Sequence, residues 1–245
     1  MNLLDIMIIV VLAVFLISGM YRGMFTSGLS TVGFLGAWYG AGRLYERVAN
    51  MALSNSTLMA VLNQYLEPES FFANHTQAMT NVADVVAGGE SAIQSAVSSI
   101  GENLAIVADA FEFNVRSQMF QNLGISTLSD YLDQTIWQAV FNVGAFILCF
   151  VALYALISLV VNLLDHVVCW PVFLGGAIDS LLGGLLGLVR GVVLVVLILS
   201  LLPSLINVVS PEFAQDLLAG STLYSTVSQM DFLGINALIQ GLIGG

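Results

Sequence analysis

The sequence predicts an all-α polytopic membrane protein with four transmembrane helices arranged as two hairpins, and an amphipathic helical insert between helices 2 and 3. Of the 245 residues, 58% are hydrophobic and only 9% are charged, against roughly 25% charged in ordinary soluble domains. Four apolar segments are long enough to cross a bilayer. A polar, acidic stretch separates the second from the third. The expected divisions are 1–50 (first hairpin), 51–133 (insert), 134–206 (second hairpin) and 207–245 (a tail with short interfacial helices).

The first hairpin comprises two apolar segments, Leu3–Met20 and Met24–Gly42, joined only by Tyr21-Arg22-Gly23. A straight helix of about 40 residues would be roughly 60 Å long, twice the thickness of the hydrocarbon core. We therefore expect a hairpin with Arg22 and Gly23 as its turn, where Gly23 supplies the backbone freedom.

The insert carries nine acidic residues and one basic residue, Arg116. Six apolar residues follow a 4-3-4-3-4 spacing that predicts one face of a single helix: Ile93, Val97, Ile100, Leu104, Val107 and Phe111. This helix would pack on a neighbouring helix of the insert, lie on the bilayer surface, or form a seam with a partner. The absence of basic residues on its polar face disfavours the bilayer surface. Thr127 and Asp130 resemble a capping box that leads into the next span.

The second hairpin comprises the apolar segments Ile136–Leu164 and Leu181–Leu202, and Pro203 favours a stop or kink. Arg190 lies inside the second of these segments and costs about 3 kcal/mol on the insertion scale. Its sixteen Leu, Ile and Val residues contribute about 0.4 kcal/mol each, which outweighs the charge.

Small residues at helical spacing predict three close-packing seams between the spans. They are Gly183, Gly187 and Gly191 on the last span; Ser30, Gly33, Ala37 and Gly40 on the second; and Ala145, Cys149 and Ala152, in line with Gln138 and Asn142, on the third. Arg190 falls on the same stripe as the glycines of the last span, and Asp179 lies close to it. This charge should therefore point at other helices.

A charged side chain within the membrane is a candidate functional residue. We expect Arg190 to be held by the hydroxyls of Ser30 and Thr31, by carbonyls near Gly183 or Gly187, or by water, with Asp179 as a further polar candidate. A snorkelling arginine that fixes helix register and an arginine on a solute path are alternatives.

Two blocks carry a family resemblance. The start, LLDIMIIVVLAVFLISGMYRGMF, resembles the opening of the colicin V production protein (CvpA) family, with matching Asp5, Arg22 and Gly23. The block AIDSLLGGLLGLVRGVVLVVLIL resembles the last span of that family, through Asp179, Gly183, Gly187, Arg190 and Gly191. The resemblance covers residues 2–50 and 136–206. The acidic insert departs from it, and Ser180 stands where the family often has a basic residue.

The resemblance implies a multi-pass protein of the bacterial cytoplasmic (inner) membrane that is associated with toxin production or secretion and with membrane homeostasis. Counting basic residues slightly favours an internal N-terminus. The family's basic short loops favour a cytoplasmic Arg22 turn instead, with the insert and both termini outside.

Several functions are disfavoured. A net charge of −11 without any lysine excludes a phosphate-backbone binder, so no nucleic-acid partner is expected. Asp165, His166 and Cys169 are too few for a metal site, the glycine-rich stretches lack phosphate-loop residues, and no cofactor or catalytic constellation is evident. We expect a non-enzymatic membrane factor that contacts lipid and, through the insert, a protein partner. The alternative is a homo-oligomeric channel or transporter with a path near Arg190. A receptor role for the insert has little support.

Overall fold

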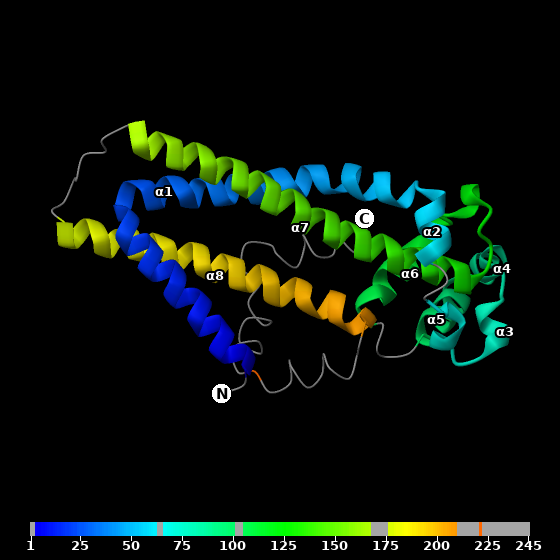
Figure 1. The fold of residues 1–245 in the computed structure, drawn as a ribbon. Coiled ribbons are helices and arrows are strands. Elements are labelled where there is room, and N and C mark those ends of the chain that lie inside the picture. The colour runs from blue at the N-terminus through cyan, green and yellow to red at the C-terminus, as the bar shows by residue number, and fades with distance from the viewer. Residues whose placement is uncertain (1–2, 63–65, 101–104, 168–175, 210–220, 222–245) are drawn as a thin grey trace. The chain divides into compact units, whose positions relative to one another are not determined.

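The structure is a computed structural model that describes residues 3–62, 66–100, 105–167, 176–209 and 221. Apart from two isolated β-bridges, every regular element in these ranges is a helix (Figure 1). Three of the described helices are long and apolar enough to cross a membrane, over Leu4–Leu53, Leu128–Leu164 and Gly176–Leu199. The chain forms two compact units. The first includes 3–45 and 146–203, and the second includes most of 46–145. The expected tail lies outside the described residues from 210 onward, apart from Ser221.

The first helix, α1 (Leu3–Leu53), is sharply bent at Gly23, where φ is 73° and ψ is 173°. This combination of angles is confined almost entirely to glycine. Helical residues flank the bend, so α1 consists of two arms, 3–22 and 24–53, and the chain turns back at Gly23 (Figure 1). The bend lies at the turn expected from the sequence.

The two other long helices are α7 (Leu128–Val167) and α8 (Gly176–Val209). α7 begins before the expected span because Thr127 caps it. The Asp130 backbone N–H donates to Thr127 Oγ1 at 3.2 Å, and the Thr127 hydroxyl donates to Asp130 Oδ2 at 2.7 Å. α8 continues past Pro203, so the stop favoured there is not observed. Proline removes only one backbone hydrogen bond, and the helix continues to Val209.

The insert is built from short helices around one apolar core. These are α2 (Ser56–Leu62), η1 (Pro68–Phe71), α3 (His75–Ala78), α4 (Val82–Ala87), α5 (Glu90–Ser98), α6 (Ala105–Ser117) and η3 (Gln121–Leu123). The start of α7 completes this core with Leu128, Tyr131, Leu132 and Ile136, and Phe111 and Val115 of α6 are fully buried in it. Such a core gives the insert its own packing within the second unit.

The expectation of one long amphipathic helix in the insert is wrong, because the described chain leaves the helix after Ser98. The Ala73 N–H donates to Ser99 O at 3.1 Å, and Ile100 forms an antiparallel bridge with Phe72. These pairings compete with helix continuation. Ile93 on α5 and Val107 and Phe111 on α6 are nevertheless all buried in one core, so α5 and α6 pack on each other as neighbouring helices. Leu104 lies outside the described residues.

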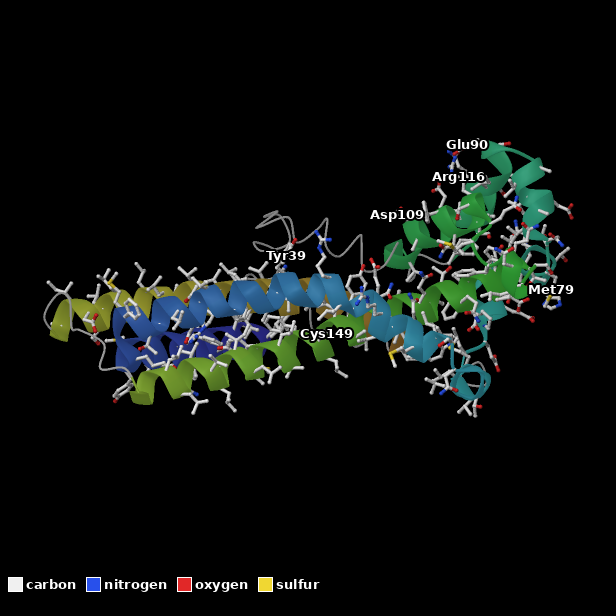
Figure 2. The ribbon with its side chains drawn as sticks, turned by 90° about the horizontal axis from the view of Figure 1, so that it is seen from above. Tyr39, Met79, Glu90, Asp109, Arg116 and Cys149 are labelled. Carbon is white, nitrogen blue, oxygen red and sulfur yellow. The ribbon has the colours of Figure 1, made fainter. Side chains whose placement is uncertain are left out.

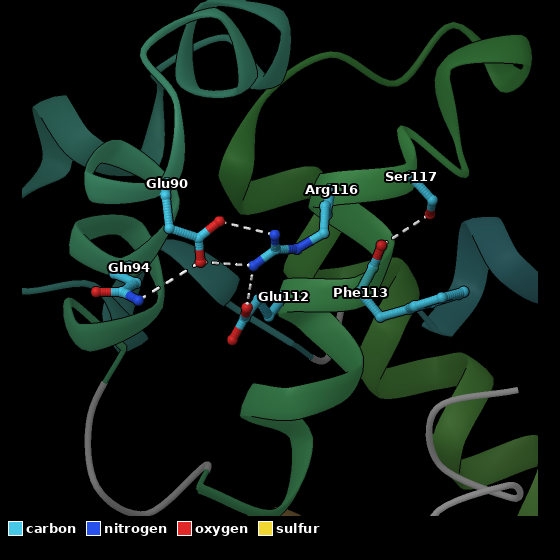
Figure 3. A network of polar contacts seen from close by, with 6 residues as sticks. All are labelled: Glu90, Gln94, Glu112, Phe113, Arg116 and Ser117. Atoms are coloured by element: carbon cyan, nitrogen blue, oxygen red, sulfur yellow. Dashed lines mark hydrogen bonds and ion pairs between the residues drawn. The ribbon is translucent and has the colours of Figure 1, made fainter.

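An ion-pair network ties α5 to α6 at the surface of the insert (Figures 2 and 3). Arg116 Nη1 and Nη2 each donate to a carboxylate oxygen of Glu90 at 2.7 Å, and Nη2 also donates to Glu112 Oε1 at 2.6 Å. The hydrogen bond from Arg116 lowers the pKa of Glu90, with the Arg116 charge and a bond from Gln94 acting in the same direction and desolvation opposing them. The same contacts raise the pKa of Arg116.

This network predicts that the insert loses stability in acid. The pKa of Glu90 is lower in the folded than in the unfolded chain, so the carboxylate contributes stability above its unfolded pKa of about 4.3. That contribution disappears as pH falls through the lower, folded pKa. We expect Glu90→Gln to lower the melting temperature at pH 7, and the difference from wild type to shrink progressively as the pH falls below the unfolded pKa, in thermal unfolding followed by circular dichroism.

Asp109→Asn is the matched control for this prediction. Asp109 is an exposed acid on α6 that forms no ion pair with another described residue, and it is labelled beside the network in Figure 2. The control should unfold like the wild type across the same pH range. A deficit of Glu90→Gln that stays constant as the pH falls below the unfolded pKa would contradict the assignment.

Candidate functional site

The bend of α1 is held by two polar residues at the start of α8. Asp179 Oδ1 accepts a hydrogen bond from the Met24 N–H at 3.3 Å, so this carboxylate caps the second arm of α1 at its positive end. The Ser180 hydroxyl donates to Met20 O at 3.0 Å, at the end of the first arm. Asp179, a polar candidate from the sequence, and Ser180, which departs from the family pattern, thus both bind the expected turn.

The first arm of α1 packs against the glycine stripe of α8 with backbone touching backbone. A Cβ on Gly187 would meet Phe15 O and lie 3.1 Å from Gly19 Cα, and a Cβ on Gly183 would lie 2.5 Å from Gly19 O. One on Gly191 would lie 2.9 Å from Phe15 Cβ. Without side chains at these positions the two helices approach closely, as small-residue seams allow in membranes.

The second arm of α1 packs on both α7 and α8. A Cβ on Gly40 would lie 2.8 Å from Leu153 Cδ1, and one on Gly33 would meet Ile157 Cγ2. Ala37 is completely buried. On the α8 side, the buried Ser27 hydroxyl donates to Gly183 O at 2.9 Å.

The third seam, on α7, departs from the expected residues at its C-terminal end. Ala145 and Cys149 of α7 are buried, but Ala152 is exposed. Beyond Cys149 the packed positions advance in steps of four residues, through Leu153 and Ile157 to the buried Val161. Steps of four drift around the helix relative to a 3.6-residue turn, which moves the contact face away from Ala152.

Arg190 lies in the interior of the first unit, with only 3% of its surface exposed. Its Cζ lies 5.0 Å from the centroid of the Phe15 ring, a cation–π contact. Nε and Nη1 have no hydrogen-bond partner, and no described acid lies within ion-pair distance of the guanidinium. Arginine stays protonated in proteins, and an unpaired buried ion costs several kcal/mol that one aromatic face does not offset.

The hydroxyls expected to hold Arg190 have other partners. Thr31 Oγ1 donates to Ser27 O at 2.8 Å and lies 3.4 Å from Leu186 O. Ser30 Oγ accepts from Arg22 Nη1 at 3.4 Å. The Gly183 carbonyl is taken by Ser27. The expectation of hydroxyl ligands for Arg190 is therefore not met: threonine in a helix bonds readily to the preceding turn, and the long Arg22 side chain reaches Ser30 from the bend.

The helix register places Arg190 well away from the α1 bend. It follows Asp179, at the level of the α1 bend, by eleven residues, or about 16 Å. The second arm of α1 runs parallel to α8 here, because Ser27 bonds to Gly183 and Thr31 contacts Leu186. One turn further on, Arg190 is level with Phe34, whose ring lies edge-on to Tyr154 of α7 at 5.6 Å. Rings from α1 and α7 thus share its level.

Sequence reasoning missed several residues of this arrangement. Phe15 and Gly19 on the first arm contact the glycine stripe of α8. Their four-residue spacing, which matches that of the α8 glycines, could have indicated this contact. Asp5, matched in the family pattern but not proposed as a site, is 2% exposed and accepts a hydrogen bond from Ser221 at 2.6 Å. The contact with Ser221 spans more than 200 residues, which no local pattern reveals.

The described residues contain no group of three or more His, Cys, Asp or Glu arranged to hold a metal ion. The side chains of Asp165 and His166 and all of Cys169 lie outside the described residues. What the site offers chemically is a buried cation with unused donors, enclosed by glycine-packed helices.

A comparison with protein families matches the family described as "Colicin V production protein" over residues 4–86 and 93–231. Searches of curated proteins and of solved structures gave no match. The family match includes most of the acidic insert, which corrects the expectation that the resemblance ends near residue 50 and resumes at 136. Because the match covers most of its length, the chain belongs to the colicin V production protein family.

Proposed function

We propose that this chain is a non-enzymatic, multi-pass protein of the bacterial cytoplasmic membrane that supports production or secretion of a colicin V-like toxin and membrane homeostasis. The family match over residues 4–86 and 93–231 carries this proposal. The three long apolar helices support the membrane location. Its partners would be the bilayer, a second copy of the chain, and a protein that binds the acidic insert.

In this proposal α1 crosses the membrane twice, so that α1, α7 and α8 supply four spans in two hairpins. The first arm, 3–22, is about 30 Å long, which equals the thickness of the hydrocarbon core. The bend at Gly23 supports two crossings, because one straight helix of this length would far exceed the bilayer.

The proposed orientation places the Arg22 turn in the cytoplasm and the insert outside. Protease added to intact spheroplasts should then cleave the stretch between Glu67 and Glu90, whereas the same stretch should be protected in inverted vesicles. The reverse pattern would overturn this orientation.

The role in toxin export is tested in a strain that makes a colicin V-like toxin. Deleting the gene for this chain should lower the toxin released into the medium, and the wild-type gene should restore it. As a control, the gene for Arg43→Gln should restore release as the wild-type gene does, since Arg43 is exposed and bonds only to Tyr39 on its own helix among the contacts described. Unchanged toxin release after deletion would reject the role.

A second candidate is an oligomeric channel or small-solute transporter with a path near Arg190. The observation that favours it is the buried guanidinium with two unpartnered nitrogens in a helix long and apolar enough to cross a membrane. Four spans seldom enclose a pore alone, so this function requires self-association. Purified protein in sealed vesicles should conduct a solute, and Arg190→Ala should abolish that flux. Equal flux in both proteins would reject this candidate.

A further inference from the structure

Two arginines reach toward the same level of the first unit without an acid between them. Arg22 starts at the bend and extends inward, so that its Nη1 lies 3.4 Å from Ser30 Oγ. Ser30 immediately precedes Thr31, which contacts Leu186 of α8. Arg190 is four residues beyond Leu186, and a helical side chain leans toward the N-terminus of its own helix. The two guanidinium groups therefore approach each other from opposite directions.

Charge supports the same picture. Among the described residues, no carboxylate lies within ion-pair distance of Arg22 or of Arg190. The Tyr154 phenol, whose ring packs on Phe34 at this level, supplies a hydrogen-bond donor but no counter-charge. The hydroxyls of Ser27 and Thr31 donate to carbonyl oxygens. Among the described residues, nothing at this level neutralises the two cations.

We infer that Arg190 and Arg22 form a binding site for one small solute anion, of the size of chloride or acetate. Arg190 supplies the buried half of the site. Its Nε and Nη1 have no partner, and the Phe15 ring covers one face of its guanidinium. Arg22 is exposed at the bend and supplies the half that meets solvent, so the anion enters from the face of the α1 turn. Charge-assisted bonds from a guanidinium to such an anion are roughly twice as strong as hydrogen bonds between neutral groups.

The site lies too deep for a lipid headgroup to be the natural occupant. Ser30 is seven residues beyond Gly23, or about 10 Å along the second arm from the bend, and Arg190 lies deeper still. A soluble anion small enough to pass Arg22 fits this position, whereas a phosphate tethered to acyl chains remains at the membrane surface.

This inference deepens the solute-path candidate and rests on it for a physiological role, but binding itself requires only the geometry. The test uses the full-length protein purified in neutral detergent, with ³⁶Cl⁻ and ¹⁴C-acetate as probes in a scintillation proximity assay. At least one probe should bind saturably to the wild type. We expect Arg190→Met to weaken that binding at least 100-fold and Arg22→Gln to weaken it about 10-fold. Arg43→Gln should bind like the wild type.

Arg22→Gln keeps the test decisive if Arg190→Met does not fold, because Arg22 is exposed and circular dichroism can show that the helices persist. Absence of saturable binding by both probes would overturn the inference, as would unchanged binding in both variants. Saturable binding of labelled phosphatidylglycerol that Arg190→Met abolishes, without saturable binding of either small anion, would also overturn it, in favour of a lipid headgroup. Saturable binding without flux in vesicles would reject the transporter but leave the site standing.

Discussion

Replacing Gly187 with alanine is expected to destabilise the packing of α1 on α8 by about 3 kcal/mol, at the upper end of the range for overpacked interiors. The added Cβ would meet the carbonyl oxygen of Phe15 and would lie 3.1 Å from Gly19 Cα. Both obstacles are backbone atoms, so no side-chain rotation relieves them and the helices must separate. Reversible unfolding of the detergent-solubilised protein in a denaturing detergent, followed by circular dichroism, measures the loss.

Gly36→Ala is the matched control for Gly187→Ala. Gly36 is also inside a long apolar helix, but nothing lies within 4 Å of its would-be Cβ. Alanine there should be neutral or stabilising by up to about 1 kcal/mol, because glycine is the poorer helix former. Equal stability of the two variants would show that contact between α1 and α8 does not depend on the glycine stripe.

The sequence predicted the apolar helices, the turn at Gly23 and most of the small residues that face other helices, because each follows from a local pattern. Length and hydropathy define a span, and four-residue glycine spacing defines a seam. The insert was harder. Its apolar residues keep a helical period from Ile93 to Phe111, yet pairing of Ile100 with Phe72 interrupts the helix. That pairing is a tertiary contact, which periodicity along one segment does not contain.

The candidate site shows the same division. The stripe predicted that Arg190 points inward, and it is buried. Its neighbours depended on the register between helices, which no single segment reveals. Thr31 and Ser30 stand near the right level, but their hydroxyls serve Ser27 and Arg22. The contact of Arg190 with Phe15 required knowing how the first arm of α1 meets α8.

Replacing Arg190 with methionine is expected to stabilise the purified protein while removing anion binding. Methionine fills much of the same volume and keeps a contact with the Phe15 ring, but it buries no charge. An intramembrane arginine costs about 3 kcal/mol on the insertion scale, and replacing buried ions by apolar side chains often stabilises proteins by about 1–4 kcal/mol. Unfolding in chloride-free, carboxylate-free buffer should therefore show Arg190→Met to be more stable than wild type by about 2 kcal/mol.

The same measurement at a saturating concentration of the bound anion separates a binding residue from a purely structural one. Ligand that binds only the folded wild type stabilises it by RT ln(1 + [L]/Kd), which is about 2.7 kcal/mol at 100 times Kd. The advantage of Arg190→Met should then disappear or reverse, because the variant gains nothing from the anion. Arg43→Gln should shift by the same amount as the wild type. If Arg190→Met were instead less stable than wild type in both buffers, the guanidinium would have a partner that stabilises it within the protein.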